Sequence, residues 1–146
     1  MNMQDIDILL VEDDSSDAEL AKRALKKSSI SNHLVHLKDG EEALDFIYGT
    51  GLFEGRNTSK KPKVIFLDLK MPKVNGIEVL KKIKEDEQTR SIPVVVLTSS
   101  KESKDIQECY RLGVNSYIVK PMGFENFTTV LNDLGIYWAQ LNNSPS

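Results

Sequence analysis

The feature that most constrains the fold of this chain is a fivefold alternation of short apolar runs with stretches of helical period. After each run, apolar residues recur at three- and four-residue steps, which is typical of an amphipathic helix. Strands that are apolar on both faces and alternate with helices predict a parallel sheet covered on both sides. We therefore expect an α/β fold with an open, doubly wound, five-stranded parallel sheet. The predicted strands are Ile6–Val11, Leu34–Leu37, Val64–Leu67, Ile92–Leu97 and Tyr117–Val119.

The residues between these runs also predict which helix faces point inward. Asp39–Glu42 and Asn75–Glu78 have the pattern of helix N-caps, so helices are expected to begin there. In the first helix, the expected inward positions are Ala18, Ala21 and Leu25, with Leu20 and Ala24. In the following four helices, in chain order, they are Ala43, Leu44, Ile47 and Tyr48; Leu80 and Ile83; Ile106, Cys109 and Tyr110; and Phe127, Val130, Leu131, Leu134, Trp138 and Leu141.

Composition limits the function classes. The 146 residues, 40% of them hydrophobic, match one domain over 1–146, with a C-terminal helical extension at about 135–146. A formal charge of −3 gives no general attraction to nucleic acid or to an anionic membrane. Cys109 is the single cysteine, and the polar start has no signal-peptide pattern, so we expect a cytoplasmic protein.

Polar residues follow four of the predicted strands. They are Glu12-Asp13-Asp14, Asp68, Thr98-Ser99-Ser100 and Lys120-Pro121. In open parallel sheets, ligands bind at the carboxyl ends of the strands, so these residues are expected to form one site. Carboxylates brought together repel unless a cation intervenes. An all-oxygen set that keeps water and meets a phosphoryl group favours Mg²⁺, whereas the chain has no Cys and His cluster that would favour zinc.

Asp68 directly follows four apolar residues, which places its carboxylate at the rigid end of a buried strand. A carboxylate held there beside a metal can act as a nucleophile toward phosphorus and become an aspartyl phosphate. Mg²⁺ and the Lys120 ammonium would neutralise charge on the transferring group, and the Thr98 hydroxyl could donate to a phosphoryl oxygen.

The order of four motifs resembles the response-regulator receiver domains of bacterial two-component signalling, including the single-domain chemotaxis type with its flavodoxin-like sheet. The motifs are I-L-L-V-E-D-D, F-L-D-L-K-M-P-x-x-N-G, V-V-V-L-T-S and S-Y-I-V-K-P, and the likeness covers about Ile6 to Leu134. Each motif is weak by itself, but the ordered set is highly specific.

This resemblance implies a role for each site residue. Asp68 is the expected phosphoacceptor, Asp13 a direct Mg²⁺ ligand and Glu12 a ligand through water. The backbone carbonyl of Lys70 is the expected third protein contact to the metal. Three further residues match conserved positions of the family: Lys120 the lysine, Thr98 the switch hydroxyl and Tyr117 the switch aromatic. The resemblance also implies that the protein catalyses only its own phosphorylation and autodephosphorylation.

Two features resemble the small regulators paired with bacterial phytochromes and other sensor kinases. They are the long connection Gly49–Lys63 and the tail Phe127–Trp138. The implied partners are a sensor histidine kinase, with a phytochrome-type kinase as the narrower expectation, and a histidine phosphotransfer or effector protein. With no output domain in the sequence, the signal is expected to leave by phosphorylation-dependent protein contact.

Three alternatives remain open at this point. A haloacid-dehalogenase-type enzyme also uses an aspartate after a strand, but it needs a second acid two residues later, where this chain has Lys70. A flavodoxin-like flavin binder needs a phosphate loop after the first strand, where three acids would repel phosphate. A receiver-like module that binds partners without being phosphorylated is the third.

The last predicted helix carries more apolar surface than one stripe against the sheet requires. Phe124, Ile136 and Tyr137 lie outside that stripe. Exposed apolar patches often mark a protein interface, and two-fold dimers are the commonest self-association. The sequence therefore predicts a homodimer that buries the face formed by the fourth helix, the fifth strand and the fifth helix.

Overall fold

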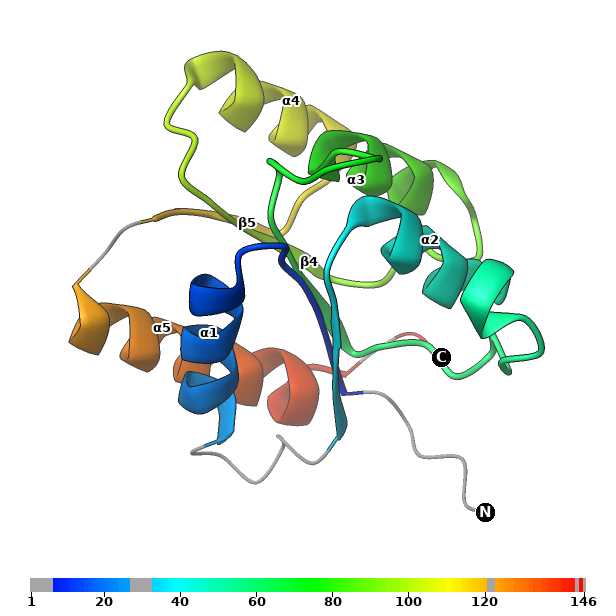
Figure 1. Cartoon of the computed structure of the whole chain (residues 1–146), viewed down its shortest axis with the longest axis horizontal. Coiled ribbons are helices and arrows are strands. Elements are labelled where there is room, and N and C mark those ends of the chain that lie inside the picture. The colour runs from blue at the N-terminus through cyan, green and yellow to red at the C-terminus, as the bar shows by residue number, and fades with distance from the viewer. Residues whose placement is uncertain (1–6, 27–32, 121–122, 144, 146) are drawn as a thin grey trace.

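A computed structural model describes residues 7–26, 33–120, 123–143 and 145, and these form a five-stranded parallel sheet between two layers of helices (Figure 1). The order β2-β1-β3-β4-β5 confirms the predicted open, doubly wound α/β fold. The strands are β1 (Ile8–Val11), β2 (Leu34–Leu37), β3 (Val64–Leu67), β4 (Val94–Thr98) and β5 (Ser116–Val119).

The helices lie on both faces of the sheet, because the strand order runs from β1 to β2 in one direction and from β3 to β5 in the other, and right-handed crossovers in opposite directions lie on opposite faces. One face is covered by α1 (Ser15–Lys26) and α5 (Phe124–Ile136), and the other by α2 (Gly40–Tyr48), α3 (Gly76–Glu85) and α4 (Ser103–Leu112) (Figure 1). A short 3₁₀ turn, η2 (Gly51–Phe53), follows α2, and a π-helical turn, η3 (Tyr137–Leu141), continues α5.

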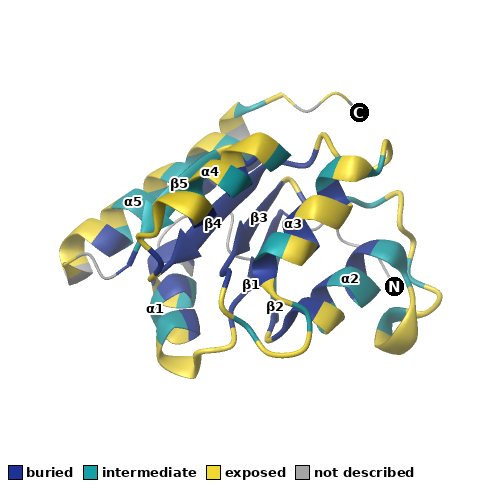
Figure 2. Ribbon diagram, turned by 90° about the horizontal axis from the view of Figure 1, so that it is seen from above, coloured by how far each residue is buried: buried dark blue, intermediate teal, exposed yellow. Residues whose placement is uncertain are grey.

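Alternate side chains of the strands point into two separate cores. Leu9, Ile65 and Val96 pack beneath α2, α3 and α4, whereas Leu10 and Phe66 pack beneath α1 and α5. The central strands β1, β3 and β4 are buried along their whole length, and the outer faces of the helices are exposed (Figure 2). This burial explains why their sequences are apolar without alternation.

Both predicted N-caps are confirmed. The Asp39 side chain accepts a hydrogen bond from the backbone N–H of Glu42 at 2.8 Å, and Asn75 accepts from the N–H of Glu78 at 3.0 Å. The first residue of α3, Gly76, packs against the strand end, since an added Cβ would lie 2.1 Å from the backbone oxygen of Asp68. Only glycine leaves room for that contact.

The strand boundaries differ from the prediction in three strands, and in β5 the difference is one residue, since this strand begins at Ser116 instead of Tyr117. Ile6 lies outside the described residues, and β1 begins at Ile8. The fourth strand begins at Val94 instead of Ile92 and extends through Thr98. Pro93 has no N–H for the sheet ladder, and the N–H of Ile92 bonds within a turn to the carbonyl of Thr89 at 3.0 Å.

Two predicted inward positions are wrong. Tyr110 is 53% exposed, because α4 turns Asp105 and Cys109 toward the protein instead. Leu141 is 66% exposed. It ends the π-helical turn, whose wider spacing shifts the inward face, and Ala139 is buried in its place.

The described helices include none that is both long enough and apolar enough to span a bilayer.

Candidate functional site

Backbone hydrogen bonds between neighbouring strands bring the polar residues to one edge of the sheet. The N–H of Glu12 donates to the carbonyl of Leu37 at 3.0 Å, and the N–H of Asp68 donates to the carbonyl of Val11 at 3.1 Å. On the other side, the N–H of Lys120 donates to the carbonyl of Thr98 at 2.7 Å. These bonds fix where each side chain leaves the sheet.

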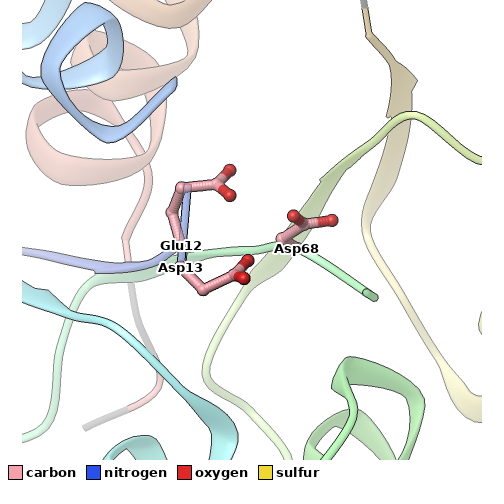
Figure 3. A group of neighbouring side chains, drawn as sticks. All are labelled: Glu12, Asp13 and Asp68. Carbon is pink, nitrogen blue, oxygen red and sulfur yellow. The ribbon is translucent and has the colours of Figure 1, made fainter. Parts of the chain in front are cut away.

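Three of the predicted residues form a carboxylate cluster. Glu12 and Asp13 follow β1, Asp68 follows β3, and one carboxylate oxygen from each lies within 4.8 Å of the other two (Figure 3). Glu12 and Asp68 are buried, whereas Asp13 is exposed. An all-oxygen donor set with one side open to water fits a hard divalent cation such as Mg²⁺.

The buried Lys120 ammonium lies beside this cluster. Its Nζ donates to Glu12 Oε1 at 2.8 Å and to Asp17 Oδ2 at 2.7 Å, and it lies 3.8 Å from Asp68 Oδ2. Burial alone would lower the pKa of Lys120, but the hydrogen bonds to Asp17 and Glu12 outweigh that effect and raise it. The side chain is therefore a permanent cation at neutral pH.

The charge state of Glu12 is finely balanced. Burial, together with the nearby Asp68 carboxylate, raises the pKa of Glu12 from 4.5 to about 7, although the bond from Lys120 opposes this shift. An additional cation at the cluster would favour the ionised form.

Thr98 and Tyr117 lie at the β4–β5 side of the site. Thr98 is fully buried at the end of β4, and its Oγ1 accepts from the N–H of Ser100 at 3.3 Å. Tyr117 pairs with Val96 across the sheet, and its hydroxyl donates to the Ser100 carbonyl at 3.0 Å. Both predicted switch residues therefore contact the loop that follows β4.

Lys70 lies in the loop after Asp68, and its backbone N–H donates to Asp68 Oδ1 at 3.3 Å. Its exposed ammonium points toward α4, where Nζ lies 4.0 Å from Asp105 Oδ2. Asp105 is buried and accepts from the Ser100 hydroxyl at 2.5 Å. The metal-binding role of the Lys70 carbonyl remains a prediction.

Sequence reasoning missed Asp17, Asp105 and His36. Asp17 lies four residues after Asp13 in an acid-rich segment just inside the predicted helix, and that spacing was the available signal. His36 Nε2 lies 2.9 Å from the backbone oxygen of Glu12. Asp105 is the third residue after the N-cap Glu102, a position where an acidic side chain often accepts from the backbone N–H of the N-cap residue. That position was a weaker signal.

Comparison with known families identifies the architecture. Residues 8–132 match the model of the response regulator receiver domain. The chain belongs to the response regulator receiver domain family. Receiver domains are phosphoacceptors of two-component signalling that receive phosphate from histidine kinases and bind a divalent metal. The predicted family is thus confirmed.

Individual relatives support the same assignment. The chain is 42% identical to "Probable methanogenesis regulatory protein FilR2" of Methanothrix harundinacea, over 94% of this chain and 86% of that protein. It superposes on the phosphorylated cyanobacterial phytochrome response regulator RcpA with a TM-score of 0.87 and 34% identity, covering 98% and 100% of the two chains. It also superposes on the Mn²⁺-bound form of the response regulator Rcp1, a Synechocystis protein, with a TM-score of 0.85 and 36% identity, covering 95% of this chain and 98% of that chain.

Proposed function

We propose that Asp68 accepts a phosphoryl group from a sensor histidine kinase, that the reaction depends on Mg²⁺, and that the phosphorylated protein signals through protein contacts. The supporting observation is the placement of Lys120, whose Nζ lies 3.8 Å from Asp68 Oδ2 and donates to Glu12 of the carboxylate cluster that Glu12, Asp13 and Asp68 form. Membership of the receiver family supports the same assignment.

In this reaction an oxygen of Asp68 attacks phosphorus, a P–O bond forms, and the bond from phosphorus to the donor imidazole nitrogen breaks. The departing imidazole keeps the electron pair and takes a proton from solvent. Lys120 would stabilise the added negative charge. Thr98 ends β4, the strand that pairs with β3 in front of Asp68, and its hydroxyl could donate to a phosphoryl oxygen. Tyr117 would then pass the change to the protein surface.

Glu12, Asp13 and Asp68, with the Lys70 carbonyl, would hold the metal ion. Mg²⁺ in this position would supply positive charge to the phosphoryl oxygens. The exposed side of Asp13 leaves room for water ligands, which Mg²⁺ retains in most protein sites. The Mn²⁺-bound form of Rcp1 supports a divalent ion here.

The proposed partners are a phytochrome-type sensor kinase and a downstream histidine phosphotransfer or effector protein. The similarity to RcpA and Rcp1 supports the phytochrome-type kinase.

We also propose a homodimer through α4, β5 and α5. Tyr110 and Tyr137 are 53% and 48% exposed, and β5 is a partly exposed edge strand. The side chain of Phe124 lies outside the described residues, and Ile136 is partly buried. Sedimentation at micromolar concentration should give a dimer, and a monomer both with and without beryllofluoride would exclude one.

Acetyl phosphate with Mg²⁺ tests the chemistry without a kinase. Intact-mass analysis should show one added phosphoryl group on the wild-type chain, and Asp68→Asn or chelation of the metal should prevent it. Asp133→Asn is the matched control, because it makes the same chemical change on the exposed surface of α5. A mass gain that persists in Asp68→Asn would show that the acceptor is another residue.

A further inference from the structure

The Lys120 ammonium has a second acidic partner outside the carboxylate cluster. Asp17, in the first turn of α1, accepts from Nζ at 2.7 Å, a shorter separation than the 3.8 Å between Nζ and Asp68. The N–H of Asp17 donates to Asp14 Oδ1 at 2.9 Å, which fixes the start of the helix and therefore the direction of the Asp17 side chain. The pair connects α1 with the end of β5.

We propose that Asp17 is a positioning residue that restrains Lys120 in the unphosphorylated protein and releases it when Asp68 carries a phosphoryl group. The inference depends on the proposed phosphorylation of Asp68. Asp17 thereby sets how readily the site takes up a phosphoryl group or its mimic.

The number of donors on the ammonium supports this competition. A lysine ammonium has three N–H donors, and Glu12 and Asp17 already use two of them. A phosphoryl group on Asp68 adds three strong acceptor oxygens beside the acceptor that Asp68 already offers. To donate to both the phosphoryl group and Asp68, Lys120 has to give up one of its present partners.

Burial indicates which partner is released. The Glu12 side chain is 4% exposed, so its carboxylate would lose a bond that water cannot replace. The Asp17 side chain is 38% exposed and can be hydrated when the ammonium moves away. Release of Asp17 is therefore the less costly rearrangement.

Asp17→Asn tests the proposal because asparagine keeps the shape and removes the charge. Glu19→Gln is the matched control: it also removes an acid from α1, but Glu19 bonds to Arg23 on the exposed face at 3.4 Å. Crystal structures of the metal-free proteins should show Nζ of Lys120 within about 3 Å of an Asp68 oxygen in Asp17→Asn. A Nζ that stays where it is in the wild-type protein would overturn the proposal.

Beryllofluoride with Mg²⁺, followed by ¹⁹F NMR, tests the functional half. Asp17→Asn should bind beryllofluoride about three- to tenfold more tightly than the wild-type and Glu19→Gln proteins, the range expected for one charge-assisted bond to a half-exposed partner. In a Lys120→Met background, the same substitution should change affinity by less than about twofold. An equal effect in both backgrounds would mean that Asp17 acts through the general field of the site, and the proposal would be wrong.

The two failures can be told apart. A wild-type protein that binds no beryllofluoride would refute the proposed function of Asp68. The metal-free crystal structures would still decide whether Asp17 restrains Lys120, because that comparison involves no phosphoryl group.

Discussion

Lys120→Met should destabilise the protein more at pH 8 than at pH 6. The substitution keeps the length of the side chain but removes the ammonium that donates to Glu12 at 2.8 Å and to Asp17 at 2.7 Å. The pair with Glu12 is buried, and removing one partner of a buried ion pair costs about 3–5 kcal/mol. The pair with Asp17 is half-exposed, and such a pair is worth about 1 kcal/mol or less. Because buried Glu12 can take up a proton instead of remaining an unpaired anion, we expect a loss near the lower limit, about 3 kcal/mol at pH 8.

The pH dependence follows from the raised pKa of Glu12. The fold raises this pKa from 4.5 to about 7, so the protonated form favours the folded state. Its stabilising contribution is complete below pH 4.5 and is lost as the pH rises through about 7. Removal of Lys120 raises the pKa of Glu12 further, and each unit corresponds to about 1.4 kcal/mol. At pH 6 the wild-type Glu12 is already largely protonated, so the loss there should be only about 1–2 kcal/mol.

Urea unfolding at both pH values, with and without Mg²⁺, measures these differences. Lys104→Met is the control, since Lys104 is 81% exposed and lies 3.9 Å from Glu102. Mg²⁺ should stabilise Lys120→Met more than the wild-type protein, because the variant cluster lacks its counter-charge. Equal losses at pH 6 and pH 8, with no additional effect of Mg²⁺, would refute the charge balance inferred for the cluster.

Three further substitutions or treatments test local features. Gly76→Ala should lower the free energy of unfolding in urea by more than about 3 kcal/mol and slow phosphorylation by acetyl phosphate. The reason is that the added Cβ would lie 2.1 Å from the Asp68 backbone oxygen. Near-wild-type stability would contradict this contact. Arg56→Lys should lower the free energy of unfolding by about 1–2 kcal/mol, the net cost of a lost hydrogen bond from a charged donor. The guanidinium donates to the Phe46 carbonyl at 2.6 Å and stacks on the Phe46 ring at 4.1 Å, so an unchanged unfolding midpoint would argue against both contacts. Cys109 should resist iodoacetamide at pH 8 until the protein unfolds, because burial raises the pKa of its thiol to about 11. Rapid labelling of the folded protein, measured by intact mass, would be inconsistent with that burial.

The strands and the strand-end residues could be predicted because both depend on local sequence. The central strands β1 and β3 are apolar on both faces, and Glu12 and Asp68 follow them at once, as Lys120 follows the edge strand β5. Because the strands are parallel, the chain order alone places these three residues at one edge of the sheet. The N-caps at Asp39 and Asn75 are similarly local, because a cap bonds within one turn of its own helix.

Other features depend on contacts between distant segments and could not be predicted. Tyr110 and Cys109 are adjacent in sequence, and both suit an inward position, but the bond from Ser100 to buried Asp105 fixes the rotation of α4 and leaves Tyr110 exposed. The bond between Asp17 and Lys120 joins residues 103 positions apart. Its existence depends on where α1 begins relative to the end of β5, which no local pattern specifies.

The sheet order also explains why a lysine, with its long side chain, connects the two sides of the site. Lys120 follows β5, whereas its partner Glu12 follows β1, and β3 and β4 lie between these two strands. Neighbouring strands are about 4.8 Å apart, so the Lys120 side chain has to extend across the ends of the intervening strands before its ammonium reaches Glu12 and Asp17. The same ammonium passes Asp68 at 3.8 Å. One cation from the edge of the sheet therefore neutralises acids that follow the central strands β1 and β3 and one that begins α1. A metal ion or a phosphoryl group that enters the site is expected to change how this single charge is shared.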